Sequence, residues 1–300
     1  MPGELQAPMW TWWIILYFFL GGVAGGAYFL SAAIELAGGP EDRPTARMGY
    51  YIAFPLAILC AVALIADLGV PLRFWHMILY SNTLLPTPKL ISPMSVGAYA
   101  LLFFGLFSFL SFLDALVETG RLHWAPLRER YSGLPRKIYA VVGGLFGFFL
   151  TAYTGVLLST SELPIWVSSP FLGALFAASG AATGMAAVVL GLRITRAGIG
   201  DSLRKLRQAD IAAILFELLL LAVFLVWLGS LALPLLTGTG GILLIAGVIF
   251  LGLLVPLILQ LVARRPAGWQ ESLVVLAAVF TLLGGFLLRT TIVLGGQGLL

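Results

Sequence analysis

The 300-residue sequence contains one cysteine and two histidines, so it has few of the side chains that bind metal redox centres. The lone Cys60 cannot form a disulfide within the chain, and it cannot hold an iron–sulfur cluster, which usually needs four thiolates. A pair of b-type haems with histidine ligands would need four histidines, and even one haem would need His76 and His123 on facing helices. Both lie in or beside expected loops. The residues therefore predict a protein with no haem, no iron–sulfur cluster and no other bound metal.

Charged residues are also scarce, at 10% of the sequence, whereas hydrophobic residues make up 60% and the mean hydropathy is +1.04. This composition excludes an ordinary soluble domain, because long apolar runs are typical of membrane helices. The net charge is +4, but no basic stripe indicates a nucleic-acid partner. The first apolar run begins at Met9 with no basic region before it and no small-residue cleavage site after it. We expect a retained helix rather than a signal peptide.

Apolar runs long enough to cross a bilayer predict an all-α integral membrane protein with eight transmembrane helices. The expected spans are approximately 10–36, 48–70, 93–117, 136–159, 170–193, 209–232, 240–263 and 269–294. No internal repeat is visible, and the first four spans carry most of the polar residues. We therefore expect two four-helix bundles, with residues 1–160 forming the functional bundle and residues 161–300 a supporting one.

The basic residues alternate between the connecting segments. Of the 17 Lys and Arg residues, all but Arg73, Lys89 and Arg289 fall in alternate connections. They are Arg43, Arg47, Arg121, Arg128, Arg130, Arg136, Lys137, Arg193, Arg196, Arg204, Lys205, Arg207, Arg264 and Arg265. Because cytoplasmic loops carry an excess of basic residues, these connections are expected in the cytoplasm of a bacterial or archaeal cell. Both termini would then face the outer, periplasmic side.

The stretch ADLGVPLRFWHMILY, residues 66–80, brings Asp67, Arg73 and His76 to the outer end of the second span. An ionisable group at the membrane boundary is costly and commonly marks function, and the following proline breaks the helix. Tyr17 and Tyr153 are expected at the same depth and on the same side, although Tyr153 could also be an interfacial tyrosine. We expect this corner to form a pocket in which a membrane-soluble redox molecule exchanges protons.

Four further polar residues lie within the spans. Arg289 could extend outward to the interface or pair with a carboxylate such as Asp67. Tyr28 and Glu35 lie near the helix face of Tyr17, so the three could form a polar track towards the cytoplasm. The alternative is that Tyr28 packs in the core and Glu35 meets the lipid headgroups. Glu217 lies within the sixth span, where a carboxylate should have a partner or a proton.

These side chains meet the needs of a quinone site: an apolar slot, hydrogen-bond donors for two carbonyl groups, and groups that pass protons. We predict that Tyr153, Asp67 and His76 are the catalytic residues that transfer protons. The predicted quinone-binding residues are Tyr17, Tyr153, Arg73 and Arg289. The sequence has no nucleophile–base pair, zinc-ligand set or phosphate loop, and it carries no electron carrier of its own. Electrons must therefore pass to or from a partner protein.

The sequence resembles the NrfD/PsrC family, the membrane subunits of polysulfide reductase and related respiratory oxidoreductases. The matching segments are WTWWIILYFFLGGVAGGAYF, DLGVPLRFWHMI, SPMSVGAYAL, AYTGVLL and LRTTIVLGGQ, which are spread over nearly the whole sequence. The resemblance implies an eight-helix subunit that binds menaquinone or ubiquinone near the outer face. It also implies a ferredoxin-like iron–sulfur partner with several four-iron clusters, which connects to a molybdenum- or tungsten-pterin catalytic subunit.

The resemblance also transfers individual residues. Tyr153 matches the family's quinone-site tyrosine on the fourth helix, and Asp67 matches the acidic residue that ends the second. Ile14 and Tyr17 stand where a polysulfide-reductase-type member has Asn and His. Tyr17 could replace the histidine as a donor, but Ile14 cannot replace the asparagine. The resemblance therefore does not fix the head-group contacts, the quinone type or the direction of electron flow.

Two other functions stay open at the level of the sequence. The first is a redox-driven proton-translocating subunit, in which Glu35, Asp114, Glu118 and Glu217 continue a proton path to the cytoplasm. The second is a secondary transporter or a structural anchor without quinone chemistry. A transporter should show repeated halves and broken helices at mid-membrane, and neither feature is evident in the sequence.

Overall fold

The computed structural model describes residues 10–80, 82–83, 85–86, 88–89, 91–123, 133–195, 201–263 and 270–300. Within these ranges the protein is almost entirely helical, and an isolated β-bridge joins Leu79 to Pro86. Eight helical segments there are long and apolar enough to span a membrane, which confirms the predicted class and number of helices.

The spans follow the predicted apolar runs closely. They are α1 (Trp12–Ala37), α2 (Arg43–Asp67), α3 (Pro93–Glu118), α5 (Leu134–Ser159), α7 (Leu172–Thr195), α8 (Asp201–Leu228), the succession α10 (Gly238–Gly241), η4 (Ile242–Leu254) and α11 (Val255–Val262), and α12 (Gln270–Gly296). Short helices lie between them: η1 (Pro40–Asp42), η2 (Pro71–Met77), α6 (Pro164–Val167), η3 (Gly229–Ala232) and α9 (Leu233–Leu236). The element η4 is a π-helical stretch inside the seventh span.

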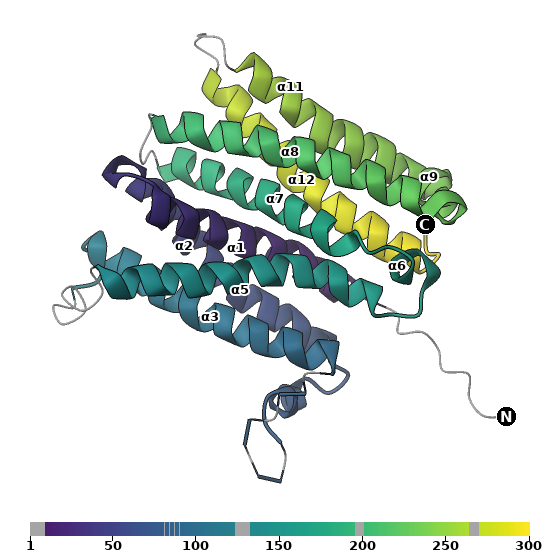
Figure 1. Ribbon diagram of the computed structural model, residues 1–300, viewed down its shortest axis with the longest axis horizontal. Helices are drawn as coiled ribbons and strands as arrows, with labels where there is room; N and C mark the ends of the chain where they lie inside the picture. Colours follow the sequence, from purple (N-terminus) through teal and green to yellow (C-terminus); the bar gives the residue numbers. More distant parts are fainter. Residues whose placement is uncertain are drawn as a thin grey trace.

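The long helices lie side by side, and α7 runs between the α1–α5 pair and the α8–α12 pair (Figure 1). Glycines bring the backbones together: a Cβ added at Gly26 of α1 would overlap the carbonyl oxygen of Gly180 of α7. A Cβ added at Gly285 of α12 would overlap the side chain of Thr183 of α7. Small residues at such positions let membrane helices approach closely. Since α7 contacts both halves of the molecule, the division into two bundles at residue 160 stays a prediction.

Both ends of the described protein meet at one end of the helices, which we call the Asp67 end. The backbone N–H of Trp10 donates to Gln297 Oε1 at 2.7 Å, and Gln297 Nε2 donates to the Trp10 carbonyl at 3.2 Å. An even number of spans requires this arrangement. Which side of the membrane this end faces stays a prediction, in part because Arg128, Arg130, Arg196, Arg264 and Arg265 lie outside the described residues.

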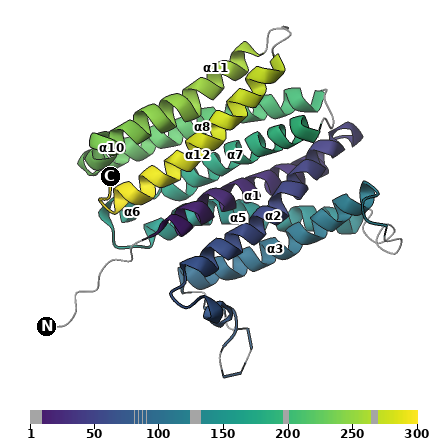
Figure 2. The same cartoon turned by 180° about the vertical axis from the view of Figure 1, so that it is seen from behind.

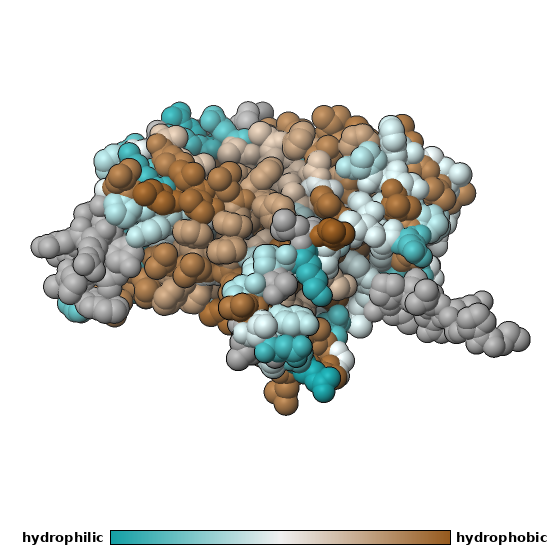
Figure 3. All heavy atoms as spheres, turned by 60° about the horizontal axis from the view of Figure 1, so that its bottom comes forward, coloured by the Kyte–Doolittle hydropathy of each residue, from teal (hydrophilic) through white to brown (hydrophobic). Residues whose placement is uncertain are grey.

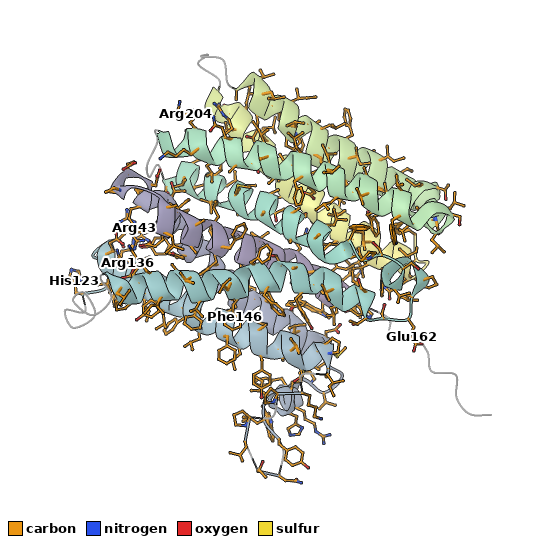
Figure 4. All side chains as sticks on the ribbon, viewed as in Figure 1. Arg43, His123, Arg136, Phe146, Glu162 and Arg204 are labelled. Atoms are coloured by element: carbon orange, nitrogen blue, oxygen red, sulfur yellow. The ribbon has the colours of Figure 1, made fainter. Side chains whose placement is uncertain are left out.

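The opposite end, which we call the Arg43 end, is held by ion pairs among α1, α2, α3 and α5 (Figure 4). Arg43 pairs with Glu35, with Asp114 Oδ2 at 3.1 Å and with Glu118 Oε2 at 2.7 Å. Arg136 Nε also lies 2.8 Å from Asp114 Oδ2. Glu35 therefore faces an arginine rather than the lipid headgroups, and the three carboxylates stabilise the helix ends.

The outer surface fits a membrane environment. Hydrophobic side chains cover the middle of the face shown in Figure 3, whereas hydrophilic ones gather towards its ends and on the projecting segment around η2. Within the described residues, many large apolar side chains on α2, α3 and α8 are exposed, among them Val62, Phe103 and Val226. Lipid contact is the ordinary explanation for such exposure on a spanning helix.

Candidate functional site

A cavity of about 640 Å³ lies at the Asp67 end of the first four spans. Its walls come from α1, α2, α3, α5 and η2, and almost all of the lining side chains are aliphatic or aromatic. The described residues contribute few polar groups to it: the Asp67 carboxylate, the hydroxyls of Tyr17 and Tyr153, and the indole of Trp10. The cavity is therefore an apolar space with hydrogen-bonding groups gathered at one end.

Asp67 is the last residue of α2, and its carboxylate is held by the start of α1. Thr11 Oγ1 donates a hydrogen bond to Asp67 Oδ1 and also accepts one from the backbone N–H of Trp13 at 3.3 Å, as an N-cap residue does. Among the described residues, Asp67 hydrogen bonds only with Thr11. Its second carboxylate oxygen, Oδ2, can therefore accept a further hydrogen bond. Asp67 was predicted from the sequence but Thr11 was not, because the two residues are 56 positions apart.

Tyr153 of α5 is buried, with 6% of its surface exposed. Its hydroxyl donates to the Pro93 carbonyl at the start of α3 at 2.5 Å. Gly97 lies one turn further along α3, where an added Cβ would overlap the Tyr153 ring. The glycine thus lets the ring lie directly against α3. Because the hydroxyl proton is engaged by Pro93, the phenolic oxygen is left to accept a hydrogen bond from the cavity.

Tyr17 is the second tyrosine of the cavity and is 2% exposed. Among the described residues no side chain or backbone group hydrogen bonds its hydroxyl. A buried tyrosine hydroxyl usually has a partner. Because the Tyr17 hydroxyl lacks one within the described protein and lines the cavity, it can donate to a polar group of a molecule bound there. The structure therefore brings Tyr17, Asp67 and Tyr153 together, as expected from their predicted depth and side.

Arg73 and His76 do not line the cavity, although both belong to η2. All four residues Arg73, Phe74, His76 and Met77 are exposed, but only Phe74 and Met77 also form part of the cavity wall. The reason is the period of a 3₁₀-helix, in which residues three apart share a side. Positions 74 and 77 share the side that borders the cavity, and positions 73 and 76 share another side. The end of η2 is fixed by Tyr99, whose hydroxyl donates to the Ile78 carbonyl at 2.5 Å.

Arg289 is fully buried in the middle of the molecule, and this placement corrects both sequence-based expectations for it. It neither extends outward nor pairs with Asp67. Its Nε donates to the Phe18 carbonyl at 3.0 Å, and its Nη1 donates to Ser179 Oγ at 3.0 Å. Gly22 makes the space for it, since a Cβ added there would overlap the guanidinium. Within the described residues, Arg289 is not part of the cavity lining.

Glu217 lies near Arg289 and is also buried, with 2% exposure. It lies near Ser179 and interacts electrostatically with Arg289, which supplies the partner expected for a carboxylate within a span. Asp210 lies two turns earlier on α8, is 3% exposed and accepts a hydrogen bond from Gln260 Nε2. Asp210 was not predicted from the sequence. The sequence feature that could have identified Asp210 is its seven-residue spacing from Glu217, which places both carboxylates on one helix face.

Tyr28 lies away from the cavity, towards the Arg43 end. Its hydroxyl is 2.6 Å from Ser111 Oγ and donates to the Tyr139 carbonyl at 2.9 Å. These bonds satisfy the hydroxyl within the core. Across the described ranges, no three His, Cys, Asp or Glu side chains come together as metal ligands would.

Comparison with known proteins gives a match along the entire sequence. Residues 1–300 match the family described as "Polysulphide reductase, NrfD". The sequence is 30% identical over 313 residues to the C chain of polysulfide reductase from Wolinella succinogenes, with 98% of this protein and 96% of that one covered. It is 27% identical over 322 residues to the NrfD homolog of Haemophilus influenzae, and the match covers 99% of this protein and 97% of that one. A shorter match, 27% over 71 residues, covers 24% of this protein and 17% of a selenate reductase subunit from Mesobacillus selenatarsenatis.

Proposed function

We propose that this protein, which belongs to the polysulphide reductase NrfD family, is the quinone-reactive membrane subunit of a respiratory oxidoreductase complex. It is a multi-pass bacterial membrane protein. The observation that carries the proposal is the cavity at the Asp67 end, in which a carboxylate and two tyrosines lie at the polar end of an otherwise apolar space. Menaquinone and ubiquinone both have a polar ring and an apolar tail, so either fits this division.

The proposed chemistry is the reversible conversion of quinol into quinone, two protons and two electrons. Tyr17 donates a hydrogen bond to one ring oxygen of the substrate, and Tyr153 accepts one from the other ring hydroxyl when the substrate is the quinol. Asp67 takes up the two protons of the bound quinol one after the other, releasing the first before it accepts the second, or returns them to the quinone in the reverse direction, as a positioned general base or acid does. His76 lies exposed on η2 beside the cavity wall, where it can pass protons to water.

The electrons pass to or from partner proteins. We propose a ferredoxin-like iron–sulfur subunit that docks at the Asp67 end, facing outward, and connects to a molybdenum- or tungsten-pterin catalytic subunit. Support comes from the names of the relatives, which are parts of a polysulfide reductase and a selenate reductase. Arg73 and Arg289 are left out of the head-group contacts, since neither lines the cavity.

Quinone analysis of the purified complex tests this proposal. We expect close to one quinone per complex after mild extraction, displaced by an inhibitor of quinol-linked turnover. If the complex turns over quinol but retains its bound quinone when the inhibitor binds, the site of quinol turnover lies outside the cavity that holds this quinone. A complex with neither bound quinone nor quinol-linked activity would refute the proposed function.

A second candidate function, coupling of the redox step to proton translocation, is favoured by one specific observation. Asp210 and Glu217 lie on one face of α8, and Glu217 lies near Ser179 and Arg289. Arg289 in turn donates to the carbonyl of Phe18, a residue that lines the cavity. Buried polar groups thus lie at intervals between the cavity wall and the Arg43-end half of α8. Ionisable residues inside the membrane commonly belong to proton paths.

Glu217→Gln tests this second function. The substitution keeps the size and a hydrogen-bonding group but removes the titratable proton. We expect proteoliposomes with the variant complex to move fewer protons per electron than the parent, while uncoupled quinol turnover is retained. The matched control is Glu271→Gln, because Glu271 is an exposed carboxylate paired with Arg193. An unchanged proton-to-electron ratio in Glu217→Gln would exclude this route.

A further inference from the structure

We infer that the apolar arm of the cavity binds the isoprenoid tail of the quinone, which enters from the lipid between α2 and α3. This inference rests on the proposed function and adds a second part to the same site. Figure 2 shows α2 and α3 side by side, with the segment that contains η2 beyond their ends. Residues of α2, α3 and η2 line the cavity, and we call the part of it between α2 and α3 the groove. The polar head would lie at the Asp67 end of this groove and the tail along it.

The arm follows one face of α3. Its residues Gly97, Leu101, Gly105 and Phe109 are spaced by four positions and all line the cavity. At 1.5 Å per residue, the distance along the helix from Gly97 to Phe109 is about 18 Å. The head-group residues lie only at the Gly97 end, where Tyr153 packs. The arm is therefore long, narrow and apolar, which suits a flexible tail rather than a second ring.

The groove is open towards lipid over much of this length. Ile58 of α2 and Leu102 and Leu106 of α3 line the cavity and are 48%, 48% and 49% exposed. Since the same side chains face both the cavity and the outside of a membrane-spanning helix pair, no protein wall separates the cavity from the lipid at this level of the described structure. The opening lies within the membrane and not at its surface.

Aromatic contacts close the groove at its far end. The Phe54 ring of α2 lies 5.0 Å from the Phe109 ring and 5.2 Å from the Phe112 ring of α3, measured between centroids. One turn further, the Tyr51 hydroxyl donates to the Ala115 carbonyl at 2.7 Å. The two helices thus meet firmly towards the Arg43 end and leave space only on the Asp67 side of Phe54. The tail must therefore leave sideways.

The charge of the lining distinguishes a quinone from a phospholipid as the occupant. None of the described lining residues is Lys, Arg or His, and the ionisable side chain at the head end is the Asp67 carboxylate. A phospholipid would bring its phosphate next to this carboxylate with no Lys, Arg or His of the described lining to compensate either charge, which is unfavourable away from water. A neutral head with hydrogen-bonding oxygens has no such conflict. The groove thus suits a neutral amphipathic molecule with a long tail.

Gly105 is the position at which the tail can be obstructed without disturbing the protein. A Cβ added at Gly105 would meet no atom within 4 Å, whereas one added at Gly97 would overlap Tyr153. A leucine at position 105 would therefore occupy the groove rather than displace a neighbouring helix. It would also favour the helix, because leucine has a higher helix propensity than glycine.

The experiment measures quinol turnover by the assembled complex with two substrates: a long-tailed menaquinol and menadiol, which has the ring without the tail. We expect Gly105→Leu to lower the ratio of kcat/KM for menaquinol over menadiol by at least about tenfold, the loss for about two methylene groups that are no longer buried. The matched control is Ala212→Leu, which adds the same side chain at an exposed position on α8. It should leave the ratio unchanged.

The outcomes separate this inference from the proposed function. If the parent complex turns over both quinols and Gly105→Leu leaves their ratio unchanged, the tail does not lie in this groove, although the quinone function stands. If Gly105→Leu lowers both activities equally, the position acts on the ring site or on the fold, which also overturns the inference. If the parent complex oxidises neither quinol and binds neither, the proposed function itself fails.

Discussion

Asp67→Asn and Tyr153→Phe each lower quinol-linked turnover of the assembled complex by about 100-fold or more, the range expected when a group that transfers or orients a proton is lost. Asparagine keeps the size of the aspartate and can still accept the hydrogen bond from Thr11, so α1 and α2 should stay in place. Phenylalanine keeps the packing against Gly97 and removes only the hydroxyl that donates to the Pro93 carbonyl. The loss should therefore be one of chemistry and not of fold.

Turnover is measured with quinol as donor and an artificial acceptor at the catalytic subunit, and the thermal unfolding of each variant is recorded beside it. Glu162→Gln is the matched control, because Glu162 is an exposed carboxylate at the same end of the molecule as Asp67 (Figure 4). It should change neither activity nor stability. If Asp67→Asn and Tyr153→Phe keep parental turnover in an assembled complex, the assignment of the site is wrong.

Arg289→Met is expected to have the largest effect on stability, a loss of about 3–5 kcal/mol in the free energy of unfolding. Arg289 is fully buried and donates to groups on α1, α7 and α12, so its removal leaves Ser179 and the Phe18 carbonyl without their partner. It also leaves the nearby Glu217 carboxylate without a compensating charge. The measurement is thermal or denaturant unfolding of the purified protein in detergent.

The double variant Arg289→Met/Glu217→Gln identifies the cause of this loss. If an uncompensated carboxylate is responsible, the double variant should be more stable than Arg289→Met alone, so that the two effects are not additive. Full additivity would show that the lost hydrogen bonds account for the effect without Glu217. A stability equal to that of the parent in Arg289→Met would contradict the packing of its guanidinium against Gly22.

The spans could be predicted because each is a long apolar run, but two boundaries differ for an electrostatic reason. The second helix begins at Arg43 rather than near residue 48, and the sixth at Asp201 rather than near residue 209. In both cases the extra turns are charged and extend beyond the apolar segment. At the second helix, Arg43 finds its carboxylate partners on α1 and α3, contacts that hydropathy does not reveal.

Residues that line the cavity could be predicted where depth within a span decided the position, as for Tyr17, Asp67 and Tyr153, and their role in quinone chemistry stays a prediction. Such residues could not be predicted where a turn set the direction of a side chain. In η2 the 3₁₀ period places Phe74 and Met77 on the side that borders the cavity and His76 on another side. Arg289 was misplaced for a different reason, because its position depends on space left by a glycine on α1, a contact between opposite ends of the sequence.

Photoaffinity labelling with a quinone that carries an azide on its ring tests whether the quinone ring binds in the cavity at the Asp67 end. After irradiation of the purified complex, mass spectrometry of the labelled peptides locates the ring. A quinone ring bound at the Asp67 end should label peptides that contain Tyr17, Asp67 or Tyr153, and excess unlabelled quinol should abolish this label. Label confined to α8, α11 or α12, or label that excess quinol does not displace, would contradict this binding site.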